Sequence, residues 1–211
     1  MDDNYTQKIN IGARILDSAR GNLYLAMRFM DIALCAFAYK PDEGRQMAGT
    51  DGNVIYYCPD YVMDRYEAGR GYADRLYLHM TLHCIYRHIF RISNRKVRLW
   101  NLACDIAVEH VIDGLPYGCV RMRIPAVRDL CYRKISEYTS ILNADLIYKY
   151  LENNPMDEDT LKAWENEFLV DDHTYWYRED KNSRSNMKNE QKWDDISRKM
   201  QTSMETIEKG I

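Results

Sequence analysis

One segment with strong β character interrupts a sequence whose periodicity is otherwise helical. The run VIYYC at residues 54–58 is β-branched and aromatic, and the DGN at residues 51–53 before it is a tight-turn signal. We therefore expect a β-hairpin over residues 44–58. Elsewhere the apolar residues follow helical spacing, and the chain holds only 5 prolines and 10 glycines. This pattern predicts a mainly α protein with a small β-hairpin or sheet, in the α+β class.

The helices can be placed approximately from the spacing of their apolar residues. Gly21 and Asn22 are expected to divide the first helical stretch into two helices. Residues 114–142 contain Pro116, Gly118 and Pro125, which point to a long loop. The helical stretches are predicted over residues 5–38, 70–92, 97–112, 144–151, 158–168 and 192–209.

The composition argues against secretion and against a membrane span. The N-terminal sequence MDDNYTQKIN is polar and acidic, which does not fit a secretory signal. No apolar run reaches the roughly 18 residues that a membrane-spanning helix needs. The 6 cysteines are scattered and include no C-x-x-C pair, which is typical of a reduced protein. We therefore expect a cytoplasmic protein with no membrane partner.

Two histidines stand four residues apart in the helix expected over residues 70–92. At this spacing His79 and His83 share one face of the helix and can hold one metal ion. In the motif H-E-x-x-H the residue after the first histidine is the general base. Here that residue is Met80, whose thioether accepts no proton at neutral pH, so the metal pair is kept and the base is lost. The pair alone is equally typical of two partly buried histidines with ordinary hydrogen-bond partners.

Three further segments accompany the histidine motif in a fixed order. They are TDGNVIYYCP at 50–59, WNLACD at 100–105 and ADLIYKYL at 144–151. With HMTLHCIYRH at 79–88, they resemble the landmarks TDG-x-x-x-YY-x-P, HE-x-x-H-x-x-x-x-H, WN-x-A-x-D and IY-x-x-L of a bacterial metallopeptidase-like family. The resemblance covers about residues 22–152 and continues more weakly through residues 171–176.

The resemblance implies a zincin-like fold, with the active-site helix packed beside an edge strand. In the family this domain precedes a von Willebrand A-like domain and is often paired with an AAA-type ATPase. Residues 1–152 are thus expected to form the zincin-like domain. Residues 153–211 would be a helical extension leading to a von Willebrand A-like domain that this sequence does not contain. The implied partners are a protein or peptide, an AAA-type ATPase and that downstream domain.

The resemblance also implies roles for individual residues. His79 and His83 match the two metal-binding histidines, zinc is the implied ion, and Met80 occupies the position of the catalytic glutamate. In zincin-like folds an edge strand beside the active-site helix receives an extended peptide, so the hairpin at 44–58 is the expected docking edge.

The third metal ligand is less strongly indicated than the first two. Asp105 lies on the next predicted helix, which can fold back, and a carboxylate is a normal zinc ligand. His88 is nine residues from His79, about 180° around an uninterrupted helix, so it would need a break to join the site. We prefer Asp105 to His88 and keep His173, in an acidic loop, as an outside candidate.

Three functions remain open on this evidence. The first is an inactive metallopeptidase-like domain that binds or scaffolds other proteins. The second is an active metal-dependent peptidase that uses Glu109 or Asp74 as a substitute base. The third is a nucleic-acid-binding module, which the net charge of −3 and the lack of a stacking-aromatic motif disfavour. Its candidate basic residues are Arg87, Arg91, Arg95, Lys96, Arg98, Arg121, Arg123, Arg128 and Arg133.

Overall fold

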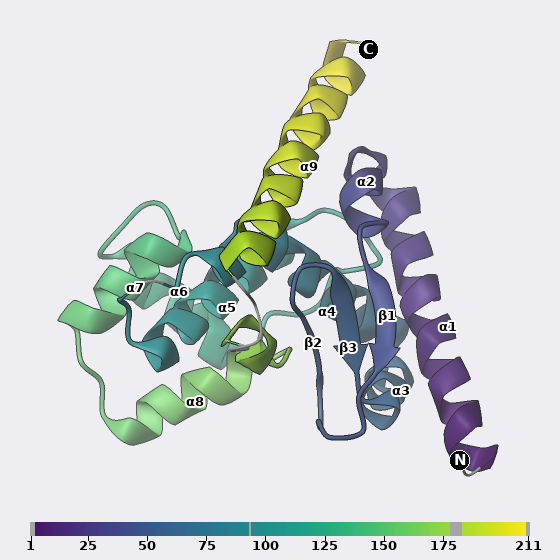
Figure 1. Cartoon of the computed structure of the whole chain (residues 1–211). Coiled ribbons are helices and arrows are strands. Elements are labelled where there is room, and N and C mark those ends of the chain that lie inside the picture. Colours follow the sequence, from purple (N-terminus) through teal and green to yellow (C-terminus); the bar gives the residue numbers. More distant parts are fainter. Residues whose placement is uncertain (1–2, 93, 178–182, 210–211) are drawn as a thin grey trace. The chain divides into compact units, whose positions relative to one another are not determined.

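The computed structural model describes residues 3–92, 94–177 and 183–209 of the chain (Figure 1). The chain divides into two compact units. Unit 1 comprises residues 1–90 and 171–211, and unit 2 comprises residues 91–170. Unit 1 is therefore discontinuous in sequence, with unit 2 inserted between its two parts.

Unit 1 contains a small sheet and the helices that surround it. The strands are β1 (Ala38–Pro41), β2 (Ala48–Thr50) and β3 (Val54–Tyr57). The helices and 3-10 turns are α1 (Asp3–Ala26), η1 (Arg28–Met30), α2 (Asp31–Leu34), α3 (Pro59–Ala68), α4 (Arg70–Ile85), η2 (His88–Phe90), η3 (His173–Tyr177) and α9 (Ser183–Lys209). Unit 2 is helical and contains α5 (Val97–Gly114), α6 (Ala126–Ser136), α7 (Ala144–Asn153) and α8 (Glu158–Phe168). The predicted class, mainly α with a small sheet, is confirmed.

The sheet has the strand order β1-β3-β2. β2 and β3 form the predicted hairpin, and the Asp51 carboxylate closes its turn by accepting hydrogen bonds from the Asn53 and Val54 N–H groups, both at 2.9 Å. β1 pairs with β3 in parallel, an element that the sequence pattern did not predict. The residue types of its four-residue sequence, AYKP, do not alternate between apolar and polar, and parallel pairing depends on a partner that lies well along the chain.

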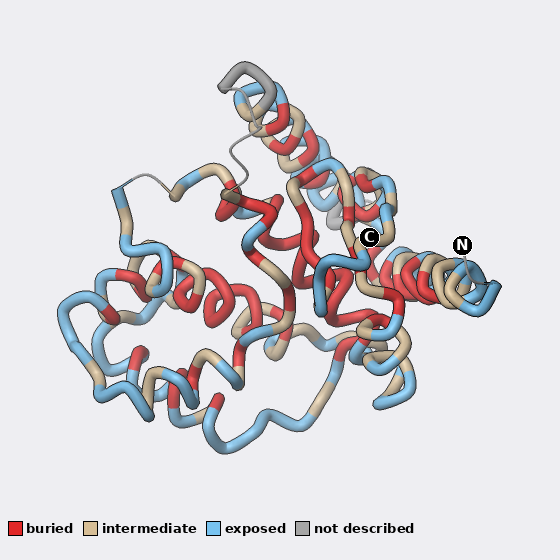
Figure 2. Tube along the Cα trace, turned by 60° about the horizontal axis from the view of Figure 1, so that its bottom comes forward, coloured by how far each residue is buried: buried red, intermediate tan, exposed pale blue. Residues whose placement is uncertain are grey.

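Helix α4 is the central helix of unit 1. Its residues from Ala73 to Cys84 are all buried, so it is enclosed on every side, whereas α1 buries only one side (Figure 2). Tyr77 of α4 packs edge-on against Phe37 and Tyr39, with ring centroids 6.1 and 6.4 Å away, and this places α4 beside the edge strand β1. The helix ends seven residues earlier than the predicted limit of residue 92, because Arg87 adopts a left-handed backbone with φ of 62°.

Three other boundaries differ from the sequence predictions. α1 runs without a break through Gly21, because a glycine within a helix costs only about 1 kcal/mol and the buried residues on either side continue the apolar face. The loop predicted over residues 114–142 contains α6, whose first residue follows Pro125; proline at a helix start is favourable rather than disruptive. α9 begins at Ser183, earlier than the predicted residue 192, and the residues 178–182 before it lie outside the described part of the chain.

In unit 2 the WN-x-A-x-D and IY-x-x-L landmarks meet. Trp100 of α5 is 1% exposed, and its ring lies 6.1 Å from that of Tyr148 on α7. The guanidinium of Arg95 lies over the Trp100 ring at 3.9 Å. These two landmarks therefore contribute to the core of unit 2.

The first landmark, the T-D-G turn, anchors α9. The Trp193 indole N–H donates to the Gly52 carbonyl at 2.8 Å, and the Asn189 amide donates to the Asp51 carbonyl at 2.8 Å. Gly52 has φ of +89°, and a Cβ there would lie 2.7 Å from the Asn189 side-chain nitrogen. Position 52 therefore needs glycine both for its backbone conformation and for the close approach of α9.

Replacing Gly52 with alanine should destabilise the protein by about 2–3 kcal/mol, because the strained backbone and the displaced Asn189 add together. Urea unfolding of Gly52→Ala and of wild type measures this loss. Gly21→Ala is the matched control, since a Cβ at Gly21 meets nothing within 4 Å. It should leave the stability unchanged or raise it by about 0.5–1 kcal/mol. Equal stability of Gly52→Ala and wild type would contradict the proposed anchoring role.

Within residues 3–177 and 183–209, leaving out residue 93, no helix combines the length and the apolar character needed to cross a bilayer. All 6 cysteines are free.

Candidate metal centre

Helix α4 brings two imidazoles together in the interior of unit 1. His79 and His83 are both 0% exposed, and their Nε2 atoms lie 2.8 Å apart. The four-residue spacing stacks the two side chains on one face of the helix, as the sequence predicted. Convergence of the two rings on one point is the first requirement for a shared ion.

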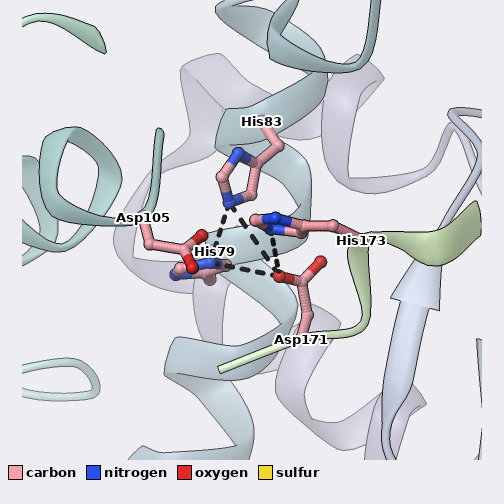
Figure 3. Close-up of side chains that lie close together, drawn as sticks. All are labelled: His79, His83, Asp105, Asp171 and His173. Atoms are coloured by element: carbon pink, nitrogen blue, oxygen red, sulfur yellow. Dashed lines mark hydrogen bonds and ion pairs between the residues drawn. The ribbon is translucent and has the colours of Figure 1, made fainter. Parts of the chain in front are cut away.

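A second segment of unit 1 supplies two more donors, Asp171 and His173 (Figure 3). The Oδ1 atom of Asp171 lies 2.9 Å from His173 Nε2, 3.4 Å from His79 Nε2 and 4.0 Å from His83 Nε2. Asp171 is 0% exposed and His173 is 6% exposed. Three imidazoles and one carboxylate thus surround one point.

The donor set fits a divalent metal ion. Zinc lies about 2.0–2.1 Å from imidazole nitrogen, so two tetrahedral ligands are about 3.3 Å apart, and the distances of 2.8 to 4.0 Å lie on both sides of this value. Both carboxylate oxygens of Asp171 are buried, and the groups near Oδ1 are imidazole nitrogens, with His173 Nε2 at 2.9 Å and His79 Nε2 at 3.4 Å. A buried carboxylate left in this state is costly unless a cation balances it. Nitrogen and carboxylate donors in a buried cluster suit zinc and related ions.

The electrostatics of the cluster also favour a charged carboxylate. Burial alone would raise the pKa of Asp171, but His173 and His79 beside it outweigh that effect and hold its pKa well below the usual range. Asp171 is therefore ionised and available as a ligand at neutral pH.

His88 lies behind His83, on the opposite side of the His83 ring from His79. The Nδ1 atoms of His88 and His83 are 3.0 Å apart, while Nε2 of His83 faces the cluster. The left-handed Arg87 supplies the break that the sequence argument required, and it turns His88 back against α4. A metal-binding histidine commonly uses its second ring nitrogen in such a hydrogen bond, which fixes the orientation of the ring.

Trp176 covers the cluster from the side of η3. Its ring stacks on His173 with centroids 3.6 Å apart, and it meets His83 edge-on at 4.9 Å. Trp176 is 4% exposed, so it helps to exclude water from the donors.

The predicted site residues can now be placed. His79, His83 and the outside candidate His173 come together in unit 1, while Met80 is fully buried in α4. Asp105 is a buried residue of α5 in unit 2, and its role as a ligand stays a prediction.

Asp171 was missed by the sequence argument. Its signals were the weaker family resemblance through residues 171–176 and the spacing D-x-H within residues 171–173, which places alternate side chains on the same side of an extended segment. The acidic neighbours made this segment resemble an ordinary solvated loop.

The two candidate substitute bases are occupied elsewhere. The Asp74 carboxylate accepts two hydrogen bonds from the Asn22 amide, both at 3.2 Å. Glu109 lies 2.5 Å from Arg128 within unit 2. Each carboxylate thus has a structural partner.

The buried carboxylate of Asp74 lowers the stability of the folded protein at neutral pH, and this effect can be tested. Burial raises its pKa to about 6, although the Asn22 hydrogen bonds oppose the shift. The folded state therefore binds this proton more tightly than the unfolded chain, and stability falls as the pH rises from about 4 to about 6. Asp74→Asn keeps a hydrogen-bonding side chain without the charge, so it should raise the free energy of unfolding at pH 7 by about 1–3 kcal/mol. Chemical denaturation at pH 7 and below pH 4 should show this gain at pH 7 only; an equal gain at both would contradict it.

The arginine-rich run is largely neutralised by acidic partners. Arg95 pairs with Asp145 at 2.5 Å, and Arg98 pairs with Glu158 at 2.8 Å and Glu165 at 2.5 Å. The other ion pairs of the candidate basic residues are Arg87 with Asp194, Lys96 with Glu152, Arg128 with Glu109, Asp113 and Glu167, and Arg133 with Asp129. Positive charges already paired in this way offer little to a phosphate backbone.

The H-x-x-x-H pair of α4, the buried Asp171 carboxylate and His173 thus form a group that could hold a metal ion, as the sites of metallopeptidases do. The chain belongs to the family described as "Putative metallopeptidase domain", which matches residues 13–207. No curated protein and no solved structure matches the chain significantly.

Proposed function

We propose that this chain is a metal-binding domain that has lost peptide hydrolysis and now binds a protein or peptide partner. His79, His83, Asp171 and His173 would hold the ion, for which zinc is the first choice. The observation that carries the proposal is the buried cluster of four donors, two of which lie on a helix with methionine at the base position. When bound in a peptidase, such an ion acts as a Lewis acid that polarises a carbonyl and acidifies water.

The donor set supports a closed rather than a catalytic site. Catalytic zinc sites use three protein ligands and keep one position open, whereas structural sites use four. Unit 1 alone provides four donors. Asp105, if it joins them as the sequence predicts, would close the site further.

Loss of the base is the second support. A hydrolytic site needs a group that takes a proton from the attacking water and delivers it to the leaving amine. The buried Met80 supplies none, and the carboxylates of Asp74 and Glu109 are held by Asn22 and Arg128.

The family resemblance supports the remaining parts of the proposal. The partner would belong to an assembly with an AAA-type ATPase and a von Willebrand A-like domain, in the cytoplasm.

The metal content of protein purified without a metal-affinity column tests the proposal. We expect about one zinc per chain, and a loss of affinity of at least about 100-fold in His79→Ala and His173→Ala. His88→Ala should lose less, about 10–100-fold, since this residue only orients a ligand. Asp105→Asn measures whether Asp105 contributes. His110→Ala is the matched control, because His110 is a histidine of unit 2 outside the cluster. Zinc-free protein that takes up no zinc on titration would refute the site.

A further inference from the structure

The residues 171–177 cover one edge of the sheet. We call this segment the strap. The Asp172 N–H donates to the Ala48 carbonyl of β2 at 2.7 Å, on the side of β2 that faces away from β3. A Cβ on Gly49 would lie 2.3 Å from the Asp172 carbonyl oxygen, so glycine lets the strap approach the strand closely. The strap therefore lies where an added strand would pair with the edge strand β2.

The strap is held at the sheet by a second set of contacts. The ring of Tyr175 stacks on Tyr56 of β3, with centroids 4.6 Å apart and planes inclined by 5°. The Tyr175 hydroxyl donates to the Asp42 carboxylate at 2.9 Å, and Arg45 lies 3.7 Å from Asp172. These contacts form a small recognition surface for an acidic residue and an aromatic residue three positions later.

The other edge of the sheet is less suited to a partner strand. β1 ends in Pro41, which has no N–H to donate, and prolines are a common way to protect an edge strand. β2 is therefore the edge of this sheet that can accept an added strand.

The same strap also carries two donors of the metal cluster. Asp171 and His173 reach the cluster, while Asp172 and Tyr175 reach the sheet. The contacts of the strap with the metal cluster and its contacts with the sheet are therefore made by the same seven-residue segment. Burial of the Asp171 carboxylate is balanced best when an ion is present, so ion binding favours the closed strap.

We infer that the strap is an autoinhibitory segment, which blocks β2 until it is displaced by an extended peptide with an acidic and an aromatic residue. This inference rests on the proposed binding function and identifies its surface. Main-chain hydrogen bonds to β2 would supply affinity, and the Arg45 and Tyr56 side chains would supply selectivity.

The test measures peptide binding by isothermal titration calorimetry on the whole chain. The probe is a synthetic peptide of residues 170–177 with Asp171→Ala and His173→Ala, so that it cannot bind metal; a scrambled peptide is its control. Tyr175→Ala removes the stacking and the hydrogen bond to Asp42 but keeps both donors. We expect it to bind the probe at least tenfold more tightly than wild type. Tyr24→Ala, at a half-exposed position on α1, should behave as wild type. If Tyr175→Ala does not fold, Tyr175→Phe removes the hydrogen bond alone and should show a smaller gain.

Hydrogen exchange separates this inference from the metal proposal. The backbone amide of Asp172 should exchange at least tenfold faster after chelation than in zinc-loaded protein, with no such change in α4. If zinc binds but neither Tyr175 variant gains affinity for the probe, the strap inference is wrong and the metal site stands. If no zinc binds but Tyr175→Ala gains affinity, the strap inference stands and the metal site is wrong.

Discussion

Removal of the metal with a chelator should lower the free energy of unfolding by about 4 kcal/mol, relative to protein in free zinc at about 1,000 times its Kd. For a chain of this size each kcal/mol is worth about 2–4 °C in Tm, so the midpoint should fall by about 8–16 °C. The physical reason is that the folded chain alone assembles the donors, and the ion offsets the burial of Asp171 among His79, His83 and His173. Differential scanning calorimetry of zinc-loaded and chelated protein measures the difference.

Two histidine variants, one inside the cluster and one outside it, serve as controls for this experiment. His173→Ala should lose at most about 1.4 kcal/mol on chelation at the same zinc concentration, because its affinity for zinc is expected to be at least about 100-fold lower. His110→Ala should respond as fully as wild type. A midpoint that does not depend on zinc in wild type would show that no ion is bound at this cluster.

The second large effect concerns hydrolysis. Wild type should cleave neither casein nor a mixed peptide library in a chelator-sensitive manner, because Met80 cannot act as a base. Restoring the base requires a free coordination position as well, since four protein donors would surround the proposed ion. We therefore expect Met80→Glu combined with Asp171→Ala to raise the rate by about 10²–10⁴, the usual contribution of general acid–base catalysis. Met80→Glu alone should gain less.

The matched control is Met80→Gln combined with Asp171→Ala, which has the same size and polarity but no base. Circular dichroism of each variant is needed because position 80 is fully buried and a carboxylate there carries a desolvation cost. Chelator-sensitive cleavage by wild type would overturn the inactive interpretation directly. Equal rates in the Glu and Gln variants would show that Met80 is not what prevents hydrolysis.

The sequence was informative where the structure depends on local spacing. The i, i+4 relation of His79 and His83 follows from helix geometry alone, and the hairpin around residues 51–53 follows from its turn residues. The sequence was less informative about elements whose formation depends on tertiary contacts. β1 pairs with β3, which lies beside it only in the folded chain, and α6 begins directly after Pro125, a residue that sequence reasoning took as the sign of a loop.

The candidate site likewise contains donors that local spacing predicts and donors that only the folded structure reveals. Its donors on α4 could be predicted because they lie four residues apart on one element. Asp171 could not, because it lies 88 positions beyond His83 and only folding brings it to the cluster. The relation of His88 to His83 depends on one backbone angle, at Arg87, which no pattern of residue types specifies.

The discontinuity of unit 1 has a consequence for the order of events during synthesis. The ribosome completes residues 1–90 and then all of unit 2 before Asp171 and His173 emerge. Until then the nascent chain offers only two of the four donors of unit 1, His79 and His83. Loop closure over this distance is slow compared with the formation of local helices. Metal capture is therefore expected late, after unit 2 has been synthesised, and it marks a chain in which the two parts of unit 1 have come together.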